Sequence, residues 1–139
     1  IDTGGLDLAS GRALDESVAH ATETTQGGQR IGEFQLVQAM LADQQIGVLA
    51  GRAMVRDAAR SYVSGADRRI APSAAKLFCT EMAGKVADLA VQVHGGWGFM
   101  DDCPASRYLR DNRICTIGDG SSQIQLQLIA RGLGLDVQF

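Results

Sequence analysis

Proline is scarce in this sequence, and so are aromatic residues. Among 139 residues there are two prolines, one tryptophan, two tyrosines and four phenylalanines. Because proline interrupts helices, so few prolines beside seventeen glycines suit helices separated by tight turns. No apolar run reaches the roughly 20 residues that a transmembrane helix needs, and no secretory signal peptide is recognisable. We therefore expect no membrane span.

Cysteine, histidine and positive charge are also limited. The three cysteines are odd in number and show no C-x-x-C spacing, which favours a reducing compartment over a disulfide framework. Two histidines without clustered ligands predict no metal site. The net charge of −3 argues against a nucleic-acid partner, whose binding surface would be basic.

Apolar residues instead make up 45% of the chain and recur at helical spacing, enough for one domain with a core. The pattern predicts helices over about 5–24, 32–64 and 72–94. A shorter helix starts at Pro104, and a last helix opens with the capping-box spacing Ser122-x-x-Gln125. Gln44 is the one polar interruption of the second apolar face.

The predicted fold class is therefore all-α. We expect an up-and-down four-helix bundle with an extra short C-terminal helix, in one domain spanning 1–139. No segment alternates with a period of two, so no sheet is expected. His20 is predicted to lie on the surface of the first helix.

Two glycine-rich turns interrupt the helical pattern, at 94–98 and 118–122. Glycine lets the backbone approach a ligand closely, and Asp119 is the single side chain between Gly118 and Gly120. From the residues alone, Asp119 is either a catalytic carboxylate or the cap of the last helix. Gly95 is likewise either part of a ligand site or the C-cap of the preceding helix.

The sequence around these turns resembles the C-terminal domain of the acyl-CoA dehydrogenases, a family of FAD-dependent flavoproteins. The resemblance covers nearly the whole chain without apparent gaps. It is carried by Gln92-Val93-His94-Gly95-Gly96-Trp97-Gly98-Phe99, Pro104, Arg110-Asp111-Asn112-Arg113, Gly118-Asp119-Gly120-Ser121-Ser122-Gln123-Ile124-Gln125, and upstream by Arg12-Ala13-Leu14-Asp15-Glu16 and Ile31-Gly32-Glu33-Phe34-Gln35.

The resemblance implies a reaction: α,β-dehydrogenation of an acyl-CoA thioester to the 2-enoyl-CoA. Asp119 occupies the position where the family has a glutamate that takes the α proton while a hydride leaves for the flavin. The backbone N–H of the same residue is expected to bind the thioester oxygen. The implied partners are acyl-CoA and an electron-transfer flavoprotein.

The resemblance also implies an FAD site in two segments. The first corresponds to the family's contact with the FAD diphosphate and adenosine, in many members across the subunit interface, and the second to a segment that holds FAD beyond the carboxylate. Gln35, in the predicted second helix, also matches a flavin contact of the family, with the alternative that it is an ordinary polar helix residue. The cofactor-binding residues so implied are Gln35, Gln92, His94, Gly95, Gly96, Ser121, Ser122 and Gln123.

The chain departs from the family pattern at two places. Asp119 replaces a glutamate and is shorter by about 1.5 Å, and Gly118 replaces an aromatic residue, which could let the backbone shift or enlarge the acyl pocket. The family's Arg-x-x-Phe-Gly, whose arginine pairs with FAD phosphates, is replaced by Thr24-Thr25-Gln26-Gly27-Gly28, with Arg30 as a possible substitute. The alternative function is thus a catalytically weak or inactive subunit with a role in assembly.

The family context leads to three further expectations. The chain corresponds to the last third of the enzyme, after a helical domain and a β domain. A homodimer or homotetramer is expected, with Trp97 and Phe99 packed against neighbouring helices or a second subunit. The compartment would be the cytoplasm in a bacterium or the mitochondrial matrix in a eukaryote.

Overall fold

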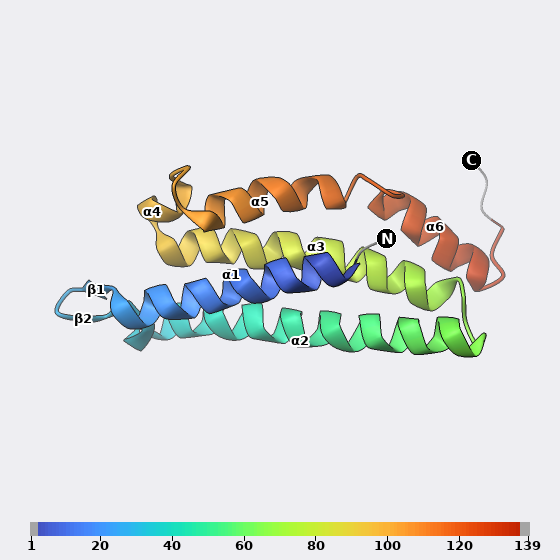
Figure 1. Cartoon of the computed structure of the whole chain (residues 1–139), viewed down its shortest axis with the longest axis horizontal. Helices are drawn as coiled ribbons and strands as arrows, with labels where there is room; N and C mark the ends of the chain where they lie inside the picture. Colours follow the sequence, from blue (N-terminus) through green and yellow to red (C-terminus); the bar gives the residue numbers. More distant parts are fainter. Residues whose placement is uncertain (1–2, 137–139) are drawn as a thin grey trace.

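The protein is a bundle of long helices connected by short turns (Figure 1). The computed structural model describes residues 3–136, and the side chains of residues 9–136. The long helices are α1 (Thr3–Glu23), α2 (Gln35–Ser64) and α3 (Ile70–His94). A single turn, α4 (Gly96–Phe99), leads to α5 (Pro104–Cys115) and α6 (Ser122–Gly132), which together run along α3 as the fourth rod. The predicted all-α bundle is confirmed.

The connection between α1 and α2 contains a small sheet, so the prediction of no sheet was wrong. Strands β1 (Thr25–Gln26) and β2 (Gln29–Arg30) pair antiparallel around Gly27-Gly28. Both glycines have positive φ, 61° and 87°, which a two-residue hairpin turn requires and which other residues adopt at a cost. A 3₁₀ turn, η1 (Ile31–Glu33), then leads into α2. Two residues per strand are too few for a period-two pattern to show in the sequence.

Helix α3 is the centre of the bundle and packs against α1, α2, α5 and α6. The main cluster of buried apolar residues joins it to α1, α2 and the start of α5, and consists of Ala13, Leu14, Val48, Met82, Val86, Ala90, Cys103 and Ala105. A smaller cluster at the hairpin end contains Ala21, Ile31 and Val93. Because α1, α2, α5 and α6 all pack against α3, residues on different faces of α3 can contact turns that are far apart in the sequence.

The helix ends follow the predicted signals with one exception. Pro72 lies in the first turn of α3 and Pro104 begins α5, as expected. The cap of α6, however, is Ser121, whose hydroxyl accepts from the Ile124 N–H at 3.4 Å. The expected box starting at Ser122 was one residue too late, because Ser122 is already helical. Within residues 3–136, none of the helices has the length and apolar character needed to cross a membrane.

Candidate functional site in the Asp119 turn

The turn between α5 and α6 has a defined backbone path. The Gly118 N–H donates to the Ile114 carbonyl at 2.8 Å, and the Ser122 N–H donates to the Thr116 carbonyl at 3.1 Å. Between these bonds Asp119 has φ 52°, and it is the one non-glycine residue of the described chain in the left-handed region. Aspartate and asparagine tolerate this conformation better than most residues, so the local sequence suits an aspartate here.

The two glycines beside Asp119 have different roles. Gly120 has φ 88°, which favours glycine, and a Cβ at this position would lie 2.7 Å from the Gln125 Nε2 atom, so the Gln125 amide would have to move away. At Gly118, a Cβ would meet only the Ile114 carbonyl oxygen, at an ordinary 3.4 Å. The backbone path therefore does not depend on Gly118, and this position can carry a larger side chain.

The Asp119 side chain is exposed and projects from a turn whose other groups are engaged. Its carboxylate makes no hydrogen bond or ion pair with any described residue, whereas its carbonyl oxygen accepts from the Gln125 amide at 3.4 Å. Since Ser121 caps α6, the reading of Asp119 as the helix cap is excluded by the geometry. The carboxylate is thus available to a ligand at this surface.

A buried lysine holds this turn, and sequence reasoning had missed it. Lys76 is 1% exposed, and its ammonium group donates to the Cys115 carbonyl at 2.9 Å and to the Gly120 carbonyl at 2.7 Å. A signal was present in the sequence, because Lys76 shares one face of α3 with buried residues at helical spacing. Those residues are Thr80, Ala83, Ala87 and Ala90.

The remaining predicted residues of this segment point in different directions. The Ser121 hydroxyl caps α6, and the Ser122 hydroxyl donates to the Glu81 carboxylate on α3. Gln123 is exposed on the first turn of α6. The segment therefore offers Gln123 and the turn backbone to a ligand, while both serine hydroxyls already have partners.

The second glycine turn follows the end of α3, and Gly95 is its C-cap, with φ 61° and an N–H that donates to the Gln92 carbonyl at 3.2 Å. Gly95 and Gly96 are exposed, and a Cβ at either position would meet no atom within 4 Å. Gln92, in the last turn of α3, is exposed as well. The Gly95 N–H is therefore engaged within the chain, whereas the exposed Gly96 backbone can be approached by a ligand such as a phosphate.

His94 is largely buried and is engaged within the chain. Its Nδ1 atom donates to the Ala90 carbonyl at 2.8 Å, and its ring stacks on His20 with the ring centroids 4.4 Å apart. His20 is consequently half-buried, and its prediction as a surface residue was wrong because α1 crosses the end of α3 here. Burial, and then the positive charge of His94, lower the pKa of His20.

Within one chain, the two glycine turns lie far apart. Lys76, which holds the Asp119 turn, and His94 are 18 residues apart on α3, or about 27 Å at 1.5 Å per residue. Figure 1 shows α4 and the hairpin gathered at one end of the bundle, with Arg30 on β2 and Gln35 at the start of α2. The structure thus groups Gln35, Gln92, His94, Gly95 and Gly96 at that end, and Ser121, Ser122 and Gln123 beside Asp119.

A basic cavity lies farther along the seam between α3 and α6. Its volume is about 410 Å³, and its lining residues include Arg68, Arg69 and Arg131 together with Ser73. Arg131 follows Ser122 by nine residues, about 14 Å along α6. In a chain of net charge −3, three arginines around one cavity make this surface locally positive, and the Arg68 guanidinium also lies over the Tyr62 ring, 5.4 Å from its centroid.

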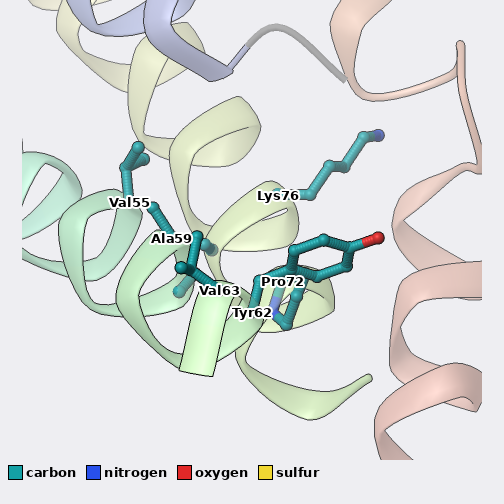
Figure 2. A pocket seen from close by; sticks show the side chains of 8 residues that line it. Val55, Ala59, Tyr62, Val63, Pro72 and Lys76 are labelled. Atoms are coloured by element: carbon teal, nitrogen blue, oxygen red, sulfur yellow. The ribbon is translucent and has the colours of Figure 1, made fainter. Parts of the chain in front are cut away.

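An apolar pocket of about 400 Å³ lies between the last turns of α2 and the first turns of α3 (Figure 2). Val55, Ala59, Val63 and Pro72 are among its lining residues, and the methylene stem of Lys76 forms part of the wall. In Figure 2 the Lys76 side chain extends away from Ala59 and Val63, toward the C-terminal segment. The stem is therefore packed on one side of α3 while the ammonium group reaches the Asp119 turn.

Large apolar side chains are exposed beside the Gly95-Gly96 turn. Trp97 is 50% exposed and Phe99 is 82% exposed, and Met100 follows them on the surface. Trp97 and Phe99 were expected to pack against neighbouring helices or a second subunit. Phe99 does not pack against the neighbouring helices of this chain, so that alternative was wrong for Phe99. In the described part of the chain, no three histidine, cysteine or acidic side chains are close enough to hold a metal ion together.

Comparison with known proteins places this geometry in a family. Residues 8–134 match the model of the acyl-CoA dehydrogenase C-terminal domain. The chain belongs to the acyl-CoA dehydrogenase family. It is 42% identical over 123 residues to a Bacillus subtilis protein named as a probable acyl-CoA dehydrogenase, covering 87% of this chain and 32% of that one.

Two other relatives extend the comparison. The CarC subunit of the caffeyl-CoA reductase–Etf complex of Acetobacterium woodii is 34% identical over 136 residues, covering 94% of this chain and 36% of its own length. The structure of butyryl-CoA dehydrogenase from Megasphaera elsdenii superposes with a TM-score of 0.91 at 27% identity, covering 94% of this chain and 34% of that one. The chain thus spans about a third of the length of these acyl-CoA dehydrogenase relatives.

Proposed function

We propose that this chain is the C-terminal domain of an FAD-dependent acyl-CoA dehydrogenase that oxidises an acyl-CoA thioester to the 2-enoyl-CoA. The observation that carries the proposal is the Asp119 carboxylate, which has no partner among the described residues and projects from a turn held by Lys76 and Gln125. Asp119 would take the α proton of the substrate. The substrate would lose two hydrogens and two electrons, one hydrogen as this proton and the other as the β hydride, for which a bound flavin would supply the acceptor.

The backbone of the same turn supplies a second element of the reaction. The Asp119 N–H would donate to the thioester oxygen, where negative charge develops as the α proton leaves. Asp119 is an exposed residue with positive φ between two glycines. The base and the oxyanion donor would thus be placed by the same peptide unit.

The residues that would hold FAD fit this group in part. The space around Gly95 and Gly96 and the exposed Gly96 backbone would suit the FAD diphosphate, with Gln92 and Gln35 exposed at the same end of the bundle. Gln123 and the start of α6 would hold FAD near Asp119. When bound, FAD would supply two-electron acceptor chemistry, and the family relation supports an electron-transfer flavoprotein as the partner that receives the electrons.

The separation of the two turns favours a homodimer or homotetramer. About 27 Å along α3 separates the diphosphate segment from the Asp119 turn, so we propose that each flavin is held by the Asp119 turn of one subunit and the Gly95-Gly96 turn of another. The exposed Trp97, Phe99 and Met100 beside Gly96 would be covered by that second subunit.

The basic cavity favours CoA as the carrier of the acyl group. CoA bears phosphate groups, and guanidinium groups bind phosphates through charge-assisted, often bidentate hydrogen bonds. Arg131 lies on α6, and Arg68 and Arg69 lie directly before α3 at the same cavity. We also propose that the protein is located in the cytoplasm of a bacterium or the mitochondrial matrix of a eukaryote. In the full-length protein, an N-terminal helical domain and a β domain would come before this domain.

Anaerobic flavin reduction by acyl-CoA tests the function in the full-length protein that contains this chain. Asp119→Asn should leave the fold and the flavin content unchanged, because the amide is close to isosteric and tolerates positive φ. It should abolish nearly all flavin bleaching, since an amide cannot accept the α proton. An Asn variant that bleaches as fast as the parent would place the base elsewhere. A parent purified without flavin would instead support the assembly role that the missing Arg-x-x-Phe-Gly suggests.

A further inference from the structure

Lys76 links the centre of the bundle to the turn that carries Asp119. Its ammonium group donates to the Cys115 carbonyl at the end of α5 and to the Gly120 carbonyl directly after Asp119. The two acceptors are 39 and 44 residues away in sequence. They flank the segment 116–119, so one side chain from α3 restrains both ends of the turn.

The burial of Lys76 makes these two bonds important. The side chain is 1% exposed, and among the described residues no carboxylate lies within ion-pair distance of its ammonium group. A buried charge is costly unless its hydrogen bonds are satisfied, so the carbonyl groups of the turn stabilise the ammonium group as much as the ammonium group stabilises the turn. Lys76 also lines the apolar pocket between α2 and α3, and its side chain extends from there toward the C-terminal segment (Figure 2).

The turn needs such restraint. Asp119 occupies the left-handed region, which costs some free energy even for aspartate, although aspartate tolerates it better than most residues. The Gln125 amide also donates to the Gly120 carbonyl, at 3.2 Å, but Gln125 belongs to the helix that the turn itself starts. Two side chains of α3 bond to this region: Glu81 accepts from the Ser122 hydroxyl at the start of α6, and Lys76 donates to the carbonyl groups at both ends of the 116–119 segment.

We propose that Lys76 is a positioning residue, which fixes the Asp119 carboxylate and N–H relative to the substrate by holding the Cys115 and Gly120 carbonyl groups. The inference rests on the proposed function, in which Asp119 is the base. A displacement of a reacting group by about 1 Å costs roughly a hundredfold in rate. Loss of Lys76 should therefore lower the rate of flavin reduction far more than it lowers the affinity for acyl-CoA.

The test compares Lys76→Met and Lys76→Arg with a matched control, Asn112→Ala. Lys76→Met keeps an unbranched apolar stem in the pocket and removes the ammonium group. Asn112 is also buried and also ties α5 to α3, by donating to the Ala83 carbonyl at 3.2 Å, but it makes no bond to the turn. All three variants are made in the full-length protein, and their flavin content and unfolding midpoints are measured first.

We expect Lys76→Met to reduce the flavin about a hundredfold more slowly at saturating acyl-CoA, with a KM within about threefold of the parent. Asn112→Ala should lower the unfolding midpoint but leave the rate within about threefold of the parent. Should Lys76→Met not fold, Lys76→Ala with added n-propylammonium replaces it, and recovery of the rate with the amine is the expected result. A parental rate in Lys76→Met, or equal rate losses in Lys76→Met and Asn112→Ala, would overturn the inference.

Amide hydrogen exchange separates this inference from the proposed function. In Lys76→Met the Gly118 and Ser122 amides, which donate within the turn, should exchange about tenfold faster than in the parent. The exchange rates in Lys76→Arg should lie between those of the parent and Lys76→Met. Unchanged exchange in Lys76→Met would refute the positioning role whatever the activity. Faster exchange together with an active Asp119→Asn would instead refute Asp119 as the base and leave the restraint of the turn by Lys76 in place.

Discussion

The imidazole rings of His20 and His94 stack with their centroids 4.4 Å apart and their planes 25° apart. This contact joins the last turn of α1 to the last residue of α3, directly before Gly95. The Nδ1 atom of His94 is fixed by the Ala90 carbonyl, so the pair has a defined orientation. Two rings that each gain a positive charge on protonation are thus packed beside the proposed diphosphate segment.

Acidification should weaken this end of the bundle. Burial and the neighbouring His94 lower the pKa of His20 in the folded chain, whereas in the unfolded chain His20 titrates near about 6.5. Below that pH the unfolded chain binds more protons, so the free energy of unfolding falls as the pH falls. We expect the midpoint to decrease between about pH 7 and pH 5.5. His20→Phe, which keeps a flat ring against His94, should show a smaller decrease; an unchanged pH dependence would contradict this account.

The amide of Gln44 should destabilise the core. Gln44 is 0% exposed, and neither its Nε2 nor its Oε1 atom has a hydrogen-bond partner among the described residues. An unsatisfied buried polar group costs about 1–3 kcal/mol, so Gln44→Met should raise the free energy of unfolding by about 1 kcal/mol. Gln45→Met, at the exposed neighbouring position, serves as the control and should change it little. A loss of stability in Gln44→Met, measured by urea unfolding, would show that the amide has a partner such as a buried water.

Lengthening the carboxylate of Asp119 should slow the reaction. Glutamate tolerates φ 52° less well than aspartate, and it places the carboxylate about 1.5 Å farther from the backbone. We expect Asp119→Glu to bleach the flavin about tenfold more slowly in anaerobic stopped-flow experiments, because the carboxylate crowds the thioester. A faster reaction would mean that the aspartate is a shortened, less competent form of the family's glutamate.

Removing the basic cavity should weaken binding of CoA but not of the acyl group. We expect Arg68→Gln combined with Arg69→Gln to lower kcat/KM for acyl-CoA by about tenfold, through lost charge-assisted bonds. The same variant should act normally on the N-acetylcysteamine thioester, which lacks the phosphates. Arg60→Gln on the exposed side of α2 is the control for a general loss of positive charge. Equal losses on both thioesters would exclude the cavity as a phosphate site.

A charge beside the Gly95-Gly96 turn should disrupt both assembly and flavin binding. Phe99 is 82% exposed, and Phe99→Asp places a carboxylate in the surface that we propose a second subunit covers. Sedimentation of the full-length protein should show a smaller species with a lower flavin-to-protein ratio. Val63→Asp serves as the control for a new surface charge. Val63 is 84% exposed and lines the apolar pocket of Figure 2. A parent that sediments as a monomer at micromolar concentration would contradict the shared flavin site.

The features that the sequence by itself determined are local in the chain. Helical spacing of apolar residues and proline and glycine at helix ends predicted the bundle, because these signals act over a few neighbouring residues. The Gly118-Asp119-Gly120 segment and its family resemblance likewise identified the turn that carries the candidate base. The hairpin was not predicted because each of its strands is only two residues long, which is too short for an alternation of apolar and polar residues to show.

The tertiary structure alone decided which of these segments meet. Lys76 reaches Gly120 across 44 residues and His20 stacks on His94, because α3 presents different faces to α1 and to the α5–α6 turn. Helix α6 begins at Ser122, so its cap is Ser121, one residue before the cap expected from the sequence. Because Ser121 caps α6, the Asp119 carboxylate is not needed as a cap. Such contacts follow from the register between packed helices, which is set by the whole core and which no local pattern encodes.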